Sequence, residues 1–143
     1  MTRTPPPGPA ALATALRACA DGFHPDAAAV ELLIRHPAWL HREDFRDGYV
    51  LTGTGVITMA AIDWPAAIAA LDNSGLPCSG GERRVLRLAA SLADGIPVDL
   101  RDAMTGMDAA NVDRAVQAML HAAGRPVWKV PGAGKFGNSA PSE

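Results

Sequence analysis

The stretch CSGGERRVLRLAASLADG, residues 78–95, decides the fold of the chain. Ser79 is followed three residues later by Glu82. This is the spacing of a capping box, in which each side chain binds the backbone N–H of the other residue. On a helical wheel three arginines share one arc and the remaining positions are apolar. The arc holds Arg83, Arg84 and Arg87, and the apolar positions are Val85, Leu86, Leu88, Ala89, Leu92 and Ala93. The stretch therefore predicts a mostly buried helix over residues 79–93 with one edge of arginines.

Two further helices are predicted after this one. PVDLRDAMTG, residues 97–106, predicts a short helix that ends at Gly106, and DAANVDRAVQAMLHAAG, residues 108–124, predicts a long one. Asp108 is the expected N-cap of the long helix, and Gly124 is its expected end. Apolar residues recur at helical spacing along it, at Val112, Ala115, Val116, Met119, Leu120 and Ala123. This pattern predicts an amphipathic helix with one apolar stripe.

The residues before the central stretch predict four short helices and a hairpin. ALATALRACADG (11–22), HPDAAAVELLIRH (24–36), AWLHREDF (38–45) and DWPAAIAALDNSG (63–75) have helical spacing and end at glycine or proline signals. Between the last two, YVLTGTGVITMAAI (49–62) places β-branched residues on both sides of TGTG, which is typical of a hairpin. We expect Trp39 and Trp64 to anchor the core, because the chain has few other large side chains.

These patterns predict one α+β domain that is predominantly α-helical, with six or seven helices, one small β-hairpin and a winged-helix-like C-terminal half. A chain of 143 residues has room for one core. We expect a globular domain over residues 10–130. The Pro- and Gly-rich residues 1–9 and 131–143 are expected to be mobile tails.

Composition excludes several classes of protein. The formal net charge of -2 gives no global attraction to nucleic acid or to an anionic membrane. No apolar run reaches the length of a membrane span, and Arg17 interrupts the only stretch that resembles a signal peptide. Cys19 and Cys78 lie far apart without a metal-type or disulfide-type pattern. We therefore expect a cytoplasmic protein, and the preference for Arg over Lys resembles the proteins of GC-rich bacterial genomes.

SGGERR (79–84), followed by TGMDAAN (105–111), resembles the signature motif and D-loop of ABC-type ATPases. Such an ATPase also needs a Gly-rich phosphate loop that ends in Gly-Lys-Ser/Thr, ahead of these motifs. The nearest match, GAGKFG (132–137), follows them and has no Ser or Thr after Lys135. The sequence therefore favours a capped helix over an ATPase.

Residues 83–130 resemble a winged helix-turn-helix: a helix, a short helix, the turn TGMD, a longer helix and a possible strand PVWKV (126–130). The resemblance implies a recognition helix that presents Asn111, Asp113, Arg114 and Gln117 to bases. Few lysines or arginines lie nearby to contact phosphates, so duplex DNA is the second choice of partner.

The N-terminal half also holds His24, His36 and His41 among acidic residues. Pro37 separates His36 from His41, and their spacing of five does not place them on one helical face. We therefore expect no metal site and no cofactor. A metal-dependent enzyme that uses these histidines remains a rival hypothesis.

The sequence favours a small non-catalytic cytoplasmic protein that binds or regulates a macromolecular partner, with a protein as the expected partner. We predict that the binding surface comprises Arg83, Arg84, Arg87, Arg114 and Gln117. The alternatives are a DNA-binding winged helix-turn-helix protein and the metal-dependent enzyme. No membrane contact is expected.

Overall fold

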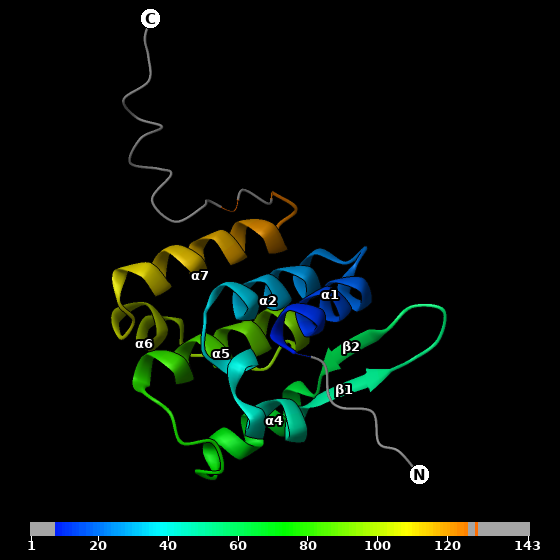
Figure 1. The fold of residues 1–143 in the computed structure, drawn as a ribbon. Helices are drawn as coiled ribbons and strands as arrows, with labels where there is room; N and C mark the ends of the chain where they lie inside the picture. Colours follow the sequence, from blue (N-terminus) through cyan, green and yellow to red (C-terminus); the bar gives the residue numbers. More distant parts are fainter. Residues whose placement is uncertain (1–7, 126–127, 129–143) are drawn as a thin grey trace, which may run out of the picture.

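The fold is known from a computed structural model, which describes residues 8–125 and residue 128. Seven α-helices and one two-stranded sheet make up the described part (Figure 1). In chain order the elements are α1 (Pro9–Ala20), α2 (His24–Arg35), the 3-10 helix η1 (Trp39–His41), α3 (Glu43–Tyr49), β1 (Val50–Gly53), β2 (Met59–Ile62), α4 (Trp64–Asp72), α5 (Gly80–Asp94), α6 (Leu100–Thr105) and α7 (Ala109–Ala122). The predicted fold class, predominantly helical with one small hairpin, is confirmed.

The element bounds differ most from the predicted ones over residues 38–49. The helix predicted over residues 38–45 is two elements, because Arg42 has an extended backbone, with φ -88° and ψ 125°, between η1 and α3. Most of the two predicted tails lies outside the described residues; of the N-terminal one only Gly8 and Pro9 are described, and Pro9 already begins α1. Of the strand predicted over residues 126–130, only Trp128 is described. The winged-helix resemblance therefore has no described strand to support it.

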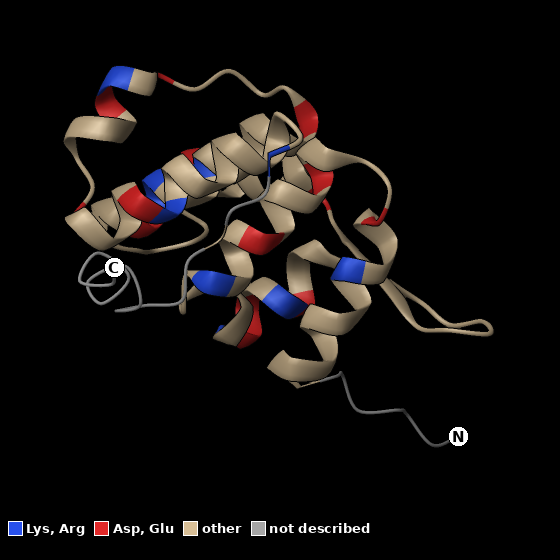
Figure 2. Cartoon of the chain, turned by 90° about the horizontal axis from the view of Figure 1, so that it is seen from above, with Lys and Arg blue, Asp and Glu red and all other residues tan. Residues whose placement is uncertain are grey.

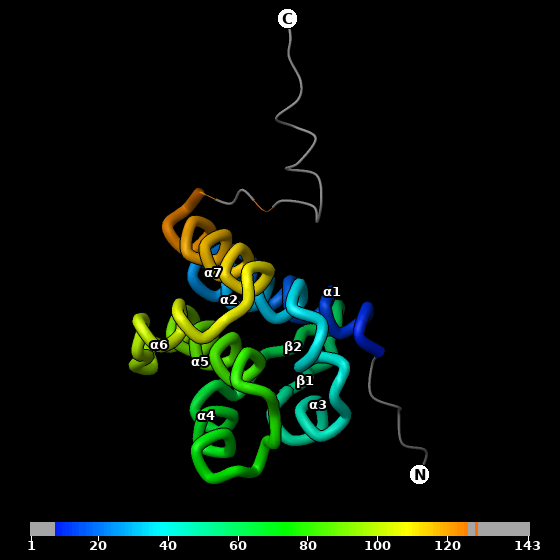
Figure 3. Tube along the Cα trace, turned by 90° about the vertical axis from the view of Figure 1, so that its left-hand side faces the viewer, coloured from blue at the N-terminus to red at the C-terminus, as the bar shows by residue number. Residues whose placement is uncertain are grey.

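Helix α2 is the centre of the fold. It packs against α5 on one side, against α7 on another and against α1 beside it. Figures 1 and 3 show α7, α2 and α5 as successive layers. Its residues Ala28, Ala29, Leu32 and Leu33 are wholly buried. Small residues at two of these positions let neighbouring helices approach closely.

Helix N-termini are fixed by the side chains that the sequence indicates. The Ser79 hydroxyl accepts a hydrogen bond from the backbone N–H of Glu82 at 3.1 Å, and the Glu82 carboxylate accepts one from the N–H of Ser79 at 2.8 Å. Asp63 and Asp108 cap α4 and α7 through their carboxylates. The predicted capping box and both predicted caps are confirmed. SGGE thus satisfies its own backbone groups without a ligand.

Trp39 is the largest wholly buried side chain. Its indole N–H donates to the carbonyl oxygen of Glu82 in the first turn of α5 at 2.9 Å, and its ring centroid lies 5.3 Å from that of Phe45. Trp64 is half-buried and packs against the same core. Trp39 therefore joins η1, α3 and α5, whereas Trp64 contributes at the edge.

Helix α7 buries only part of the apolar stripe that the sequence indicates. The buried residues of α7 are Asn111, Ala115 and Ala118. Of the stripe, Ala115 is buried, but Val116 is 43% exposed and Ala123 is exposed. Asn111, which is not part of the stripe, is buried where its side chain contacts His36 at the end of α2.

No helix in the described residues is long and apolar enough to cross a membrane.

Candidate functional site

Arg84, one of the predicted binding residues, joins α5 to α6. Its Nε donates to the backbone oxygen of Asp102 at 3.1 Å, its Nε and Nη2 donate to the Asp102 carboxylate at 3.2 and 3.1 Å, and its Nη1 donates to the oxygen of Gly106 at 3.3 Å. The hydrogen bonds from Arg84 are the main cause that lowers the pKa of Asp102, and the positive charge of Arg84 lowers it further. The guanidinium is directed at this chain's own acceptors and not at an outside ligand.

Two glycines make room for this guanidinium. A Cβ on Gly106 would lie 2.2 Å from the Cζ and Nε atoms of Arg84, and one on Gly80 would lie 2.7 Å from Nη1. Real Cβ atoms do not approach so closely, and at Gly106 the group in the way is the bonded guanidinium. Gly80 of SGGE and Gly106 of TGMD therefore have a packing role, although they lie in segments that resemble nucleotide-binding motifs.

Arg87 is also paired within the chain, with the carboxylate of Asp72 at the end of α4. A cavity of about 320 Å³ lies between α5 and α6, and it is lined by Arg84, Arg87, Pro97, Val98, Asp99, Asp102 and Ala103. Its two arginines face two aspartates, so it offers no net positive charge to an anion. No hydrogen bond or ion pair of Arg83 is found within residues 8–125 and 128.

The α7 part of the predicted surface is engaged as well. Arg114 donates from Nη1 to the Oδ1 atom of Asn111 at 2.8 Å. Gln117 is half-buried, and its Oε1 atom is buried without a hydrogen-bond partner in the described part of the chain. Among the five predicted residues, the structure thus leaves only Arg83 with no described partner and an exposed side chain. The five do not form one free basic surface.

His36 and Asn111 form a buried polar pair. His36 is 6% and Asn111 7% exposed, and the Nδ1 atom of His36 lies 3.0 Å from Oδ1 of Asn111. Because that oxygen accepts, Nδ1 carries the proton and Nε2 is an acceptor; Nε2 is buried with no partner among the described residues. Burial lowers the pKa of His36; the nearby charge of Arg114 lowers it further, and Asn111, Glu82 and Asp108 oppose the shift.

This buried imidazole predicts acid sensitivity. Since the pKa of folded His36 lies below its ordinary value of 6.5, the folded state binds this proton less readily than the unfolded state. Stability should be level above about pH 6.5 and should fall as the pH drops from there through the folded pKa. The free energy of unfolding of wild type and of His36→Gln, measured by urea denaturation at pH values above and below about 6.5, tests this prediction. Burial also lowers the pKa of His121, so the stability of both proteins should fall further as the pH drops. Identical slopes in the two proteins would contradict the prediction.

The histidines of the metal hypothesis lie in different settings. His36 is buried against Asn111, His41 is exposed in η1, and the ring of His24 lies 6.2 Å from that of His121. Residues 8–125 and 128 contain no group of three or more His, Cys, Asp or Glu that is arranged to hold a metal ion.

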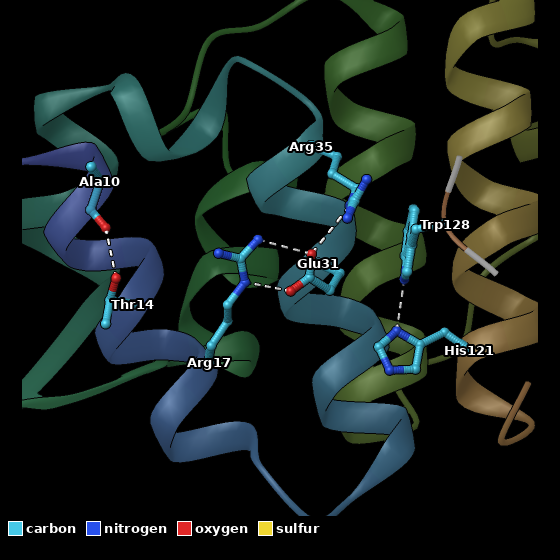
Figure 4. Close-up of polar contacts among 7 residues, drawn as sticks. All are labelled: Ala10, Thr14, Arg17, Glu31, Arg35, His121 and Trp128. Carbon is cyan, nitrogen blue, oxygen red and sulfur yellow. Dashed lines mark hydrogen bonds and ion pairs between the residues drawn. The ribbon is translucent and has the colours of Figure 1, made fainter. Parts of the chain in front are cut away.

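Trp128 is held against α2 and α7 (Figure 4). Its indole N–H donates to Nδ1 of His121 at 2.8 Å, and the guanidinium carbon of Arg35 lies 4.8 Å from its ring centroid. Arg35 also donates to Glu31 at 3.2 Å, and Arg17 of α1 binds the same carboxylate at 2.5 Å. Burial raises the pKa of Glu31, but the hydrogen bonds and charges of Arg17 and Arg35 lower it by more. This network ties α1 and Trp128 to α2.

The hairpin carries an exposed apolar surface that the sequence interpretation did not single out. Leu51, Val56, Ile57 and Met59 are 59%, 104%, 60% and 38% exposed. The hairpin extends from the helical body, and Figure 2 shows it without a charged residue along its length. Residues 50–62 contain no Asp, Glu, Lys or Arg. The absence of charged residues from this segment is the feature of the sequence that could have indicated the exposed apolar surface.

No family model, curated protein or solved structure matches the chain.

Proposed function

We propose that the protein is a non-catalytic cytoplasmic binding protein that acts through a protein partner, and that it contacts this partner with the β-hairpin of residues 50–62. The exposure of four large apolar side chains on one uncharged, projecting hairpin carries the proposal. Contiguous exposed apolar side chains of this kind mark protein contact sites, because leaving them in water costs free energy.

The contact surface proposed here differs from the arginine surface predicted from the sequence. Arg84, Arg87 and Arg114 are engaged by Asp102, Asp72 and Asn111, so an outside acidic group would have to compete with these contacts. The burial of Asn111 against His36 also weighs against the DNA alternative, because a buried amide cannot meet a base edge. The two free thiols, Cys19 and Cys78, are compatible with a reducing compartment.

A photo-crosslinking amino acid placed at Val56 tests the proposal in host cells. We expect a protein adduct from this position, and we expect Ile57→Asp in the same chain to reduce its yield at least tenfold, because a buried carboxylate would lie in the apolar contact. The matched control carries the crosslinker at Ala109, which is exposed on α7. Absence of a protein adduct at Val56, or equal adducts at both positions, would refute the proposed function.

A further inference from the structure

Strand β1 has a free edge. The sheet contains only β1 and β2, paired antiparallel with Val50 opposite Ile62 and Leu51 opposite Ala61. The backbone N–H of Asp63 donates to the oxygen of Tyr49 at 2.9 Å, so Tyr49 and Asp63 form a hydrogen-bonded pair. Because such pairs alternate with non-hydrogen-bonded ones along an antiparallel ladder, Leu51 also points its backbone groups at β2. The N–H and C=O groups of Val50 and Thr52 therefore point away from β2.

These outward backbone groups have no hydrogen-bond partner in the described part of the chain. Helix α1 packs against β2, and the tip of the hairpin extends beyond the helices in Figure 1. An open edge of this kind accepts another strand.

The exposed face of the same hairpin is apolar. Ala60 and Ile62 are buried, whereas Met59 and Ala61 are exposed. Leu51 lies opposite Ala61 and shares that outer face. A hairpin with one face in water normally alternates apolar and polar residues. Here both faces carry apolar residues, so the outer face favours contact with another apolar surface.

The absence of charge points to the occupant. Two identical surfaces that meet about a two-fold axis oppose each charge near the axis with its own like charge. Residues 50–62 carry no charge, so they can face a copy of themselves without this repulsion. They also give a charged partner nothing to pair with.

We infer that two copies of this chain associate through the outer edges of β1, in antiparallel pairing centred on Leu51. The inference rests on the proposed function: it keeps the hairpin as the contact surface and names a second copy as the occupant. Thr52 of each copy then exchanges backbone hydrogen bonds with Val50 of the other, and the two Leu51 side chains lie side by side on the outer face. The strand direction brings Val56 and Ile57 toward the end of α3 in the second copy, which covers the most exposed side chains.

Oligomeric state tests the inference on the full chain. The contact is smaller than the roughly 800 Å² per partner of a standard interface, so a weak dimer is expected. Sedimentation equilibrium from about 1 µM to about 1 mM, the range of weak complexes, should show the mass doubling for wild type. Leu51→Lys should remain monomeric, because it opposes two ammonium groups at the axis. Ala61→Lys, on the same face but on β2, should still dimerise.

A disulfide experiment tests the register. In a Cys19→Ser, Cys78→Ser background, Leu51→Cys should oxidise to a covalent dimer, because directly opposed Cα atoms of a non-hydrogen-bonded pair lie about 4.5 Å apart. Thr52→Cys should yield at least tenfold less dimer, because each introduced cysteine lies opposite Val50 of the other copy and not opposite the second cysteine. A chain that stays monomeric at every concentration, or that crosslinks equally at both positions, overturns the inference.

The failure of this inference and that of the proposed function can be told apart. A monomeric chain whose Val56 crosslinker labels a different protein keeps the proposed function and loses the self-pairing. A chain that dimerises with the expected register and labels only itself keeps both, because the second copy is then the protein partner. A chain that gives no protein adduct at Val56 loses the proposed function.

Discussion

Replacement of Trp39 by alanine is expected to lower the free energy of unfolding by about 4 kcal/mol, the largest loss for any single substitution considered. The indole is wholly buried, packs against Phe45 and donates to the carbonyl oxygen of Glu82. Its removal leaves a cavity between η1 and α5 and a carbonyl without its donor. Domains of this size have about 5–15 kcal/mol in total, so the expected loss is a large share of the stability.

Urea denaturation followed by far-UV circular dichroism measures this effect. Trp39→Phe keeps a buried ring beside Phe45 but loses the N–H group and part of the bicyclic ring, so we expect a smaller loss than for Trp39→Ala. Trp64→Ala removes a half-buried ring of the same type and should cost less than Trp39→Ala. A loss at Trp39 no greater than that at Trp64 would show that Trp39 does not anchor the core.

Replacement of Asn111 by alanine is expected to cost about 2 kcal/mol. The change removes the oxygen that accepts from Nδ1 of His36 and from Nη1 of Arg114. Arg114 can reach water, but the buried N–H of His36 cannot, and an unpaired buried donor costs about 1–3 kcal/mol. The cost should appear in urea denaturation at neutral pH, where His36 is uncharged.

Asn111→Asp provides a matched control with a weaker response to acid. Its carboxylate still accepts from both neighbours, and its charge should raise the pKa of His36. A group with a raised folded pKa stabilises the fold at low pH, so this variant should lose less stability than wild type between about pH 7 and pH 5. Equal stability of the alanine variant and wild type would mean that the buried pair contributes nothing.

Local sequence signals predict the elements well. The Ser79–Glu82 spacing, the caps at Asp63 and Asp108 and the uncharged hairpin depend on residues close together in the chain. The arginine arc of α5 is likewise a property of one helix. These features needed no knowledge of the packing.

Local sequence signals do not predict features that depend on contacts between residues far apart in the chain. The apolar stripe of α7 does not indicate that Asn111 is buried, because its partner His36 lies 75 residues away in the chain. Arg84 and Arg87 lie on the predicted arc, but their partners Asp102 and Asp72 come from other helices. The arginines on this arc therefore suggested a binding surface, whereas two of the three form contacts within the chain.

The central place of α2 also sets the order in which the chain can fold. Helix α2 leaves the ribosome early, but the helices that bury its apolar faces are residues 80–94 and 109–122. At about 5–20 residues per second, α2 spends several seconds of synthesis without them. Contacts between such distant segments also require large loops to close before any burial is gained. The native core therefore assembles only after residues 109–122 have been made, and until then the faces of α2 that pack against α5 and α7 are without these partners.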